Sequence, residues 1–183
     1  MLEKRINLVF AWLDRAERDG AESRIADALM RDAAKNAQRE VPQTATSAGL
    51  ARTAIHEAGH AVIAHVGGLR VGTVRIRGDA SGSCGYEGED EIGLISADLA
   101  GVFAELAGGA SVERQEALSH SSDILQARVR MDQFPHNWRR PLTIGAACAV
   151  ESNWLAIVRT ATALQALGDL GNAEVAALCG RLQ

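Results

Sequence analysis

The chain has few cysteines and no long apolar run, and each of these shortages excludes a class of protein. Its three cysteines are an odd, widely spaced set without a C-x-x-C pair. This argues against a disulfide framework and a thiolate zinc site, and it indicates reduced thiols in a cytoplasmic protein. No segment approaches the ~20 apolar residues that span a bilayer, and the first residues carry mixed charges, unlike a signal peptide. We therefore expect a cytoplasmic protein without a membrane span.

The chain also lacks an excess of positive charge and a nucleotide-binding motif. The net charge of −4 argues against a general nucleic-acid binder, which would carry a basic stripe. The chain contains no G-x-x-x-x-G-K-[ST] loop, so we expect no ATP-driven motor of its own. The chain is rich in apolar residues. Of its 183 residues, 47% are hydrophobic, which is enough for the core of one ordinary domain with a modest extension.

The spacing of these apolar residues predicts a mainly α protein with a small β-sheet, of the α+β class. Pro42 to Gly49 is the candidate linker, which divides the chain into an N-terminal helical extension (1–45) and a main domain (46–183). In the extension we expect an amphipathic helix from Met1 to about Arg18, packed on the domain or on a second copy, and a more polar helix over 21–40. In the main domain we expect a helix over 50–66, strands over 71–77 and 83–87, a loop over 87–91, helices over 96–107, 110–117 and 123–133, a loop over 134–141, a helix over 143–167, a turn over 168–171 and a helix over 173–182.

The stretch His56-Glu57-Ala58-Gly59-His60 carries the chemistry of the sequence. Histidines four residues apart share one face of a helix, so both imidazoles can point at one divalent ion. Glu57 can then reach the water that the ion polarises, as in the H-E-x-x-H zinc hydrolases. Gly59 costs a helix about 1 kcal/mol relative to alanine. Either another backbone or a substrate passes close to it, or a small residue is simply tolerated there.

A catalytic zinc site also needs a third protein ligand and an open position for water. No histidine stands where an H-E-x-x-H-x-x-G-x-x-H enzyme has its third one, and His65 falls roughly 140° round the helix from His60. The ligand must therefore lie downstream. The candidates are Asp98, Glu105, Glu113, Glu116, His120 and Asp123.

Four ordered segments resemble the peptidase domain of the FtsH family, the AAA+ zinc proteases, across about residues 46–183. These are the motif helix at 53–62, the strands at 71–86, an L-G-G-R-A-A-E-like segment at 106–113 and an S-N-D-L-x-x-A-T-like segment at 121–127. The resemblance implies a zincin-like motif helix beside short strands, followed by a helical bundle. It also implies that His56, His60 and Asp123 bind Zn²⁺ and that Glu57 is the general base.

The sequence departs from the family at several positions. Ala110 stands where the family has an arginine, and Arg128 stands where it has a threonine. Neither the ATPase module nor the membrane anchor of the family is seen. These departures leave the implied ligands in place but put ring assembly and coupling to an unfolding motor in doubt.

Together these features predict a soluble zinc endopeptidase that cleaves unfolded proteins or peptides without ATP. The expected partner is a polypeptide substrate, lying along an exposed strand edge at residues 82–87. A separate ATPase and a second copy of the chain are further partners that this interpretation allows. Two alternatives stay open: another zinc hydrolase, with Glu105 or Glu113 as third ligand, and a catalytically silent adaptor. Peptide deformylase is disfavoured because no cysteine precedes His56.

Overall fold

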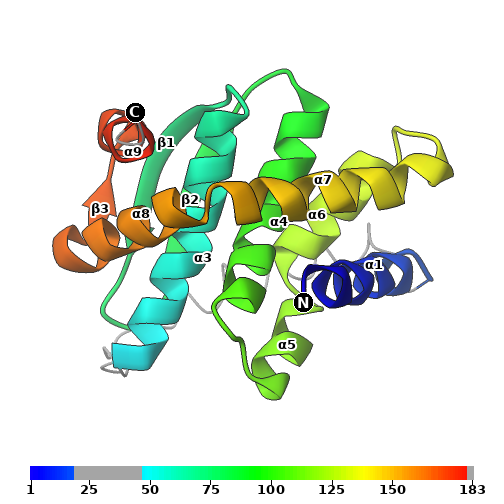
Figure 1. Ribbon diagram of the computed structural model, residues 1–183, viewed down its shortest axis with the longest axis horizontal. Coiled ribbons are helices and arrows are strands. Elements are labelled where there is room, and N and C mark those ends of the chain that lie inside the picture. Colours follow the sequence, from blue (N-terminus) through cyan, green and yellow to red (C-terminus); the bar gives the residue numbers. More distant parts are fainter. Residues whose placement is uncertain (19–46, 181–183) are drawn as a thin grey trace, which may run out of the picture.

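Two helices rich in alanine and aliphatic residues, α3 (Ser47–Val66) and α4 (Glu91–Ala107), form the centre of the structure. The computed structural model describes residues 1–18 and 47–180. In it the two helices pack side by side (Figure 1). Gly59 lies at their contact, where an added Cβ would be 2.8 Å from both the Ala100 carbonyl oxygen and the Ala104 Cβ. Of the explanations left open for Gly59, the structure shows the close passage of another backbone.

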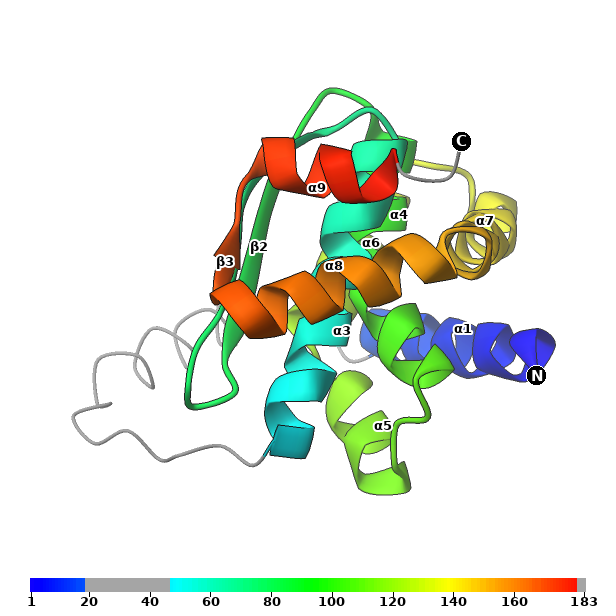
Figure 2. The ribbon, with the colours of Figure 1, turned by 60° about the vertical axis from the view of Figure 1, so that its left-hand side comes forward.

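A three-stranded antiparallel sheet covers one side of α3 (Figure 2). Its strands are β1 (Arg70–Ile76), β2 (Gly82–Glu87) and β3 (Asp169–Leu170), in the order β2-β1-β3. Val71 and Val74 of β1 are buried in the core, and β2 lies at the edge of the sheet. The sheet therefore presents one strand edge beside the motif helix.

The remaining helices surround this pair and complete a mainly α, α+β fold, as the sequence predicts. They are α1 (Leu2–Arg18), α5 (Val112–Leu118), α6 (Ser122–Met131), the 3-10 helix η1 (His136–Trp138), α7 (Arg139–Ser152), α8 (Trp154–Leu167) and α9 (Asn172–Cys179). Helix α8 runs across α3, and α6 and α7 pack on α4 (Figure 1). Helix α1 packs on α6 and α7, with Ile6, Val9, Trp12 and Leu13 buried.

Several boundaries differ from the prediction. Helix α4 begins at Glu91, five residues before the expected Ser96, because the Asp90 side chain accepts a hydrogen bond from the Ile92 amide and caps the helix. The expected loop over 134–141 contains η1 and the start of α7, whose first turn accommodates Pro141 because backbone amides there have no helical partner.

The expected helix over 143–167 is two helices, α7 and α8, divided at Asn153. The expected turn over 168–171 contains β3, which pairs with Val74 and Arg75 of β1. The last three residues of the expected linker, 47–49, belong to α3. The predicted helix over 21–40 and the rest of the linker lie outside the described residues, and the division at residue 45 stays a prediction.

Within the described residues, no single helix is both long enough and apolar enough to cross a membrane. The pair His136–Ser152 and Trp154–Leu167, bent by 68°, meets the length and composition requirement only when taken together.

Candidate metal centre

The two motif histidines present the same ring nitrogen to one point. They lie one turn apart on α3, and their Nε2 atoms are 3.0 Å from each other. Both residues are mostly buried, with side-chain exposures of 12% for His56 and 6% for His60. Two unprotonated nitrogens at this separation repel each other unless a cation lies between them or one of them is protonated.

Asp123 completes a group of three donors. It is the second residue of α6, which has Ser121 as its N-cap and begins one residue before the helix predicted over 123–133. Its Oδ2 atom lies 3.1 Å from His56 Nε2 and 3.8 Å from His60 Nε2. Within residues 1–18 and 47–180, this is the group of at least three His, Cys, Asp or Glu side chains that could hold a metal ion.

Each histidine is held from behind through its other ring nitrogen. His60 Nδ1 lies 2.7 Å from the backbone carbonyl oxygen of Ala97, and His56 Nδ1 lies 2.7 Å from Glu105 Oε1. An acceptor at Nδ1 favours the tautomer whose proton is on Nδ1, which leaves the Nε2 lone pair free. Metal-binding histidines in proteins are commonly held in this way.

The three donors fit a tetrahedral ion. Zinc binds histidine nitrogen and carboxylate oxygen at about 2.0–2.2 Å, which places neighbouring ligand atoms about 3.3 Å apart. The three observed separations of 3.0, 3.1 and 3.8 Å scatter around this value. The residues therefore suit a small divalent cation with one position open toward the cleft.

The charged groups at the site shift one another's pKa values. Burial alone would lower the pKa of His56, but the adjacent carboxylates of Asp123 and Glu105 outweigh burial and raise the pKa to about 10. Burial alone would raise the pKa of Asp123, but His60 and His56 hold it well below its usual value.

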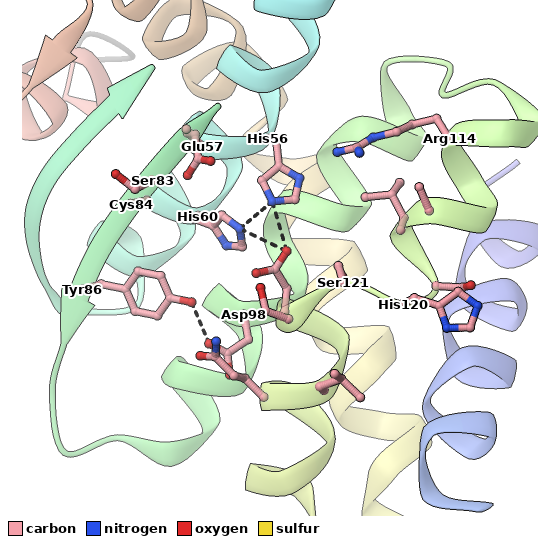
Figure 3. Close-up of a pocket in the computed structure, with 18 of the residues that line it drawn as sticks. His56, Glu57, His60, Ser83, Cys84, Tyr86, Asp98, Arg114, His120 and Ser121 are labelled. Atoms are coloured by element: carbon pink, nitrogen blue, oxygen red, sulfur yellow. Dashed lines mark hydrogen bonds and ion pairs between the residues drawn. The ribbon is translucent and has the colours of Figure 1, made fainter. Parts of the chain in front are cut away.

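Glu57 lies beside the donors in a cleft of about 940 Å³. It is 7% exposed, and burial raises the pKa of its carboxyl. One wall of the cleft is β2, with Ser83 and Cys84 close to Glu57 (Figure 3). An added Cβ at Gly82 would lie 2.5 Å from Glu57 Oε1, so a side chain there would displace the carboxylate.

A comparison with protein families bears on this region. Residues 37–112 match the Peptidase M50B-like family. This match supports a metallopeptidase-like domain, and it includes His56, Glu57 and His60 but ends before Asp123. M50 is a site-2 protease family, so the match supports the expected metallopeptidase without supporting FtsH in particular. No curated protein matches the chain.

The remaining ligand candidates of this metallopeptidase-like domain lie elsewhere. Glu105 faces the Nδ1 side of His56, away from the shared Nε2 point. Asp98 accepts hydrogen bonds from Tyr86 and Arg130. The other three are exposed: Glu113 and Glu116 on α5, and His120 at the end of the cleft away from His56 (Figure 3).

Two functional features of α4 were not predicted from the sequence. An added Cβ at Gly101 would lie 2.8 Å from His56 Nε2 and closer still to His60 Nε2, so only glycine leaves room for both rings. Glu105 was considered as a ligand but not as a partner of His56. The signal available was that Glu105 is the one polar residue in the apolar stretch 99–107 of α4. A buried ionised group needs a partner, so such a residue indicates a polar contact.

A second polar cluster supports the other side of the site. Tyr86 stacks on the His60 ring with centroids 6.0 Å apart and donates a hydrogen bond to Asp98 at 2.6 Å. Arg130 Nε donates to the same carboxylate at 3.0 Å. Burial nevertheless dominates and raises the pKa of Asp98 to about 6. This cluster fixes β2 against α4 and α6 next to His60.

Proposed function

We propose that the protein is a zinc-dependent endopeptidase whose ligands are His56, His60 and Asp123. The observation that carries the proposal is the convergence of two Nε2 atoms and one carboxylate oxygen, with each imidazole held at Nδ1. An FtsH-like histidine, histidine and aspartate set fits this arrangement. The metallopeptidase-like family match supports the same class of reaction.

Glu57 is the proposed general base. A bound zinc ion would bring the pKa of a water toward 7 and polarise the scissile carbonyl. Glu57 takes the proton of the attacking water on its carboxylate and delivers it to the leaving amine nitrogen. Burial suits this cycle, because it raises the pKa of Glu57 and so helps the carboxyl hold the proton between the two steps.

The proposed substrate is an extended, unfolded segment of polypeptide. Strand β2 is an edge strand and forms a wall of the cleft at Ser83 to Tyr86. An extended peptide can add to such an edge through main-chain hydrogen bonds, which bind many sequences. Edge addition here would place the peptide beside Glu57 and the three donors, and we expect it to need no nucleotide.

The test compares the wild-type protein with Glu57→Gln, without ATP. Zinc content is measured together with cleavage of an unfolded protein such as casein. We expect wild type to bind one zinc ion and cleave casein, and Glu57→Gln to keep the metal and lose cleavage. Glu89→Gln, which changes an exposed carboxylate in the loop after β2, serves as control and should behave as wild type.

The same measurements, with Asp123→Ala added as a further variant, separate the alternatives. Bound zinc with no cleavage by either protein would favour the silent adaptor. Full zinc retention by Asp123→Ala would favour a hydrolase with a different third ligand. Equal cleavage by wild type and Glu57→Gln would refute the proposed mechanism.

A further inference from the structure

Three helices are linked behind His56 by one buried carboxylate. Glu105 on α4 has no side-chain exposure, and its Oε1 atom lies 2.7 Å from His56 Nδ1 on α3. From the other side, Arg114 on α5 donates through Nε to Oε2 at 2.7 Å and through Nη2 to Oε1 at 2.5 Å. The result is a continuous path from Arg114 through Glu105 to His56.

The burial of Glu105 needs a physical reason. An ionised carboxylate without partners is costly in a protein interior, and a guanidinium that donates two parallel hydrogen bonds is the strongest partner available. Arg114 is 34% exposed, so its charge keeps contact with solvent while its donors reach the buried carboxylate. This arrangement keeps Glu105 charged and fixed in orientation.

The position of Glu105 distinguishes it from a ligand. It approaches His56 at Nδ1, whereas His60 and Asp123 approach at Nε2, on the other side of the ring. His60 has a neutral counterpart in the Ala97 carbonyl oxygen at 2.7 Å. Of the two histidines, His56 is therefore the one held by a full charge.

We propose that Glu105, held by Arg114, is a positioning residue for His56. It fixes the orientation of the ring and keeps the proton on Nδ1, which leaves Nε2 to bind the metal. Carboxylates in this relation to a metal-bound histidine also make the imidazole a better donor. The inference rests on the proposed function of the site, because it concerns how firmly His56 holds zinc.

The test measures zinc affinity by competition with a chromophoric chelator, independently of catalysis. We expect Glu105→Gln and Glu105→Ala to bind zinc 10- to 100-fold more weakly than wild type. Glu113→Gln, which removes an exposed carboxylate beside Arg114 on α5, is the matched control and should leave affinity unchanged. Circular dichroism of the metal-free proteins verifies that each variant is folded.

A double-mutant cycle tests whether Arg114 acts through Glu105. We expect Arg114→Ala to weaken zinc binding in the wild-type background by less than Glu105→Gln does. We expect little further effect in the Glu105→Gln background, because the path is already broken. Arg114→Lys keeps the charge and should restore part of the loss. The visible absorption of the Co²⁺-loaded proteins should shift in Glu105→Gln and not in Glu113→Gln.

The possible outcomes separate this inference from the proposed function. Equal zinc affinity in wild type and folded Glu105→Gln would overturn the inference and leave the metal site standing. Full additivity of the two substitutions would overturn the role of Arg114 as the group that holds Glu105. Failure of wild type to bind zinc would overturn both proposals together.

Discussion

Replacing Gly101 by alanine should damage the metal site while sparing the fold. The added Cβ would lie 2.8 Å from His56 Nε2, and ordinary van der Waals contact begins at 3.4 Å, so the nitrogen must retreat by 3.4 − 2.8 = 0.6 Å. His60 Nε2 must retreat further. Neither ring can move freely, because each Nδ1 lies 2.7 Å from an acceptor behind it.

This displacement exceeds what a metal site tolerates. Ligand distances in real sites vary by about 0.2 Å, so a shift three times as large removes at least one good ligand. We expect zinc affinity to fall at least tenfold, equivalent to about 1.4 kcal/mol. The backbone itself should benefit, since alanine is favoured over glycine in a helix by about 1 kcal/mol.

Two other glycines supply the controls. Gly145 lies within α7 with nothing within 4 Å of an added Cβ, so Gly145→Ala should stabilise the fold by up to about 1 kcal/mol and leave zinc binding unchanged. Gly59→Ala would press on the backbone of α4 and should destabilise the fold by about 1–3 kcal/mol. Urea unfolding of the metal-free proteins and zinc titration measure both quantities. Wild-type zinc affinity in Gly101→Ala would refute this reasoning.

The remaining predictions concern the groups around the donors. Ser121→Ala removes the N-cap of α6 and should lower the free energy of unfolding in urea by about 1 kcal/mol. Zinc binding should also weaken, because Asp123 lies in that first turn. Unchanged stability would contradict this prediction. Tyr86→Phe should cost about 1–2 kcal/mol by the same measurement, because it removes a hydrogen bond to buried Asp98, and it should leave zinc affinity unchanged. In the metal-free protein the raised pKa of His56 stabilises the fold fully below its unfolded value of 6.5, and this contribution is lost as the pH rises toward about 10. Zinc must displace that proton, so calorimetry at pH 7.5 in two buffers of different ionisation heat should show proton release, and its absence would contradict the protonated state.

Features with local causes could be predicted from the sequence. The motif helix followed from apolar spacing and ends at Val66 as predicted, just before Gly67 and Gly68, the latter with a φ of +79°. The start of α6 was predicted to within one residue, and Ser121 caps it. In these places the residues that determine the structure lie within a few positions of one another.

Features with distant causes could not be predicted in the same way. Strand β3 has two residues, too few for an alternating pattern, and exists because β1 pairs with it. The break at Asn153 is hidden because apolar residues continue at helical spacing on both sides. The contact between Glu105 and His56 joins residues far apart in the sequence, so no spacing rule reveals it.

The candidate third ligand falls between these two cases. Residue types alone left six downstream candidates, and a family resemblance selected Asp123. The structure brings Asp123 to the two histidines and holds Glu105 and Asp98 in other contacts. Metal binding by Asp123 stays a prediction until it is measured.

The proposed ligands and base all stand on helices, whereas much of the cleft does not. His56, Glu57 and His60 come from α3 and Asp123 from α6, both packed on α4. The walls that a substrate would meet include the exposed positions of β2 and the segment 119–121 between α5 and α6. Insertions or substitutions in these walls can therefore alter which peptides enter while the donor atoms keep their spacing. With this arrangement, related sequences can change which substrates they select while keeping the same catalytic residues.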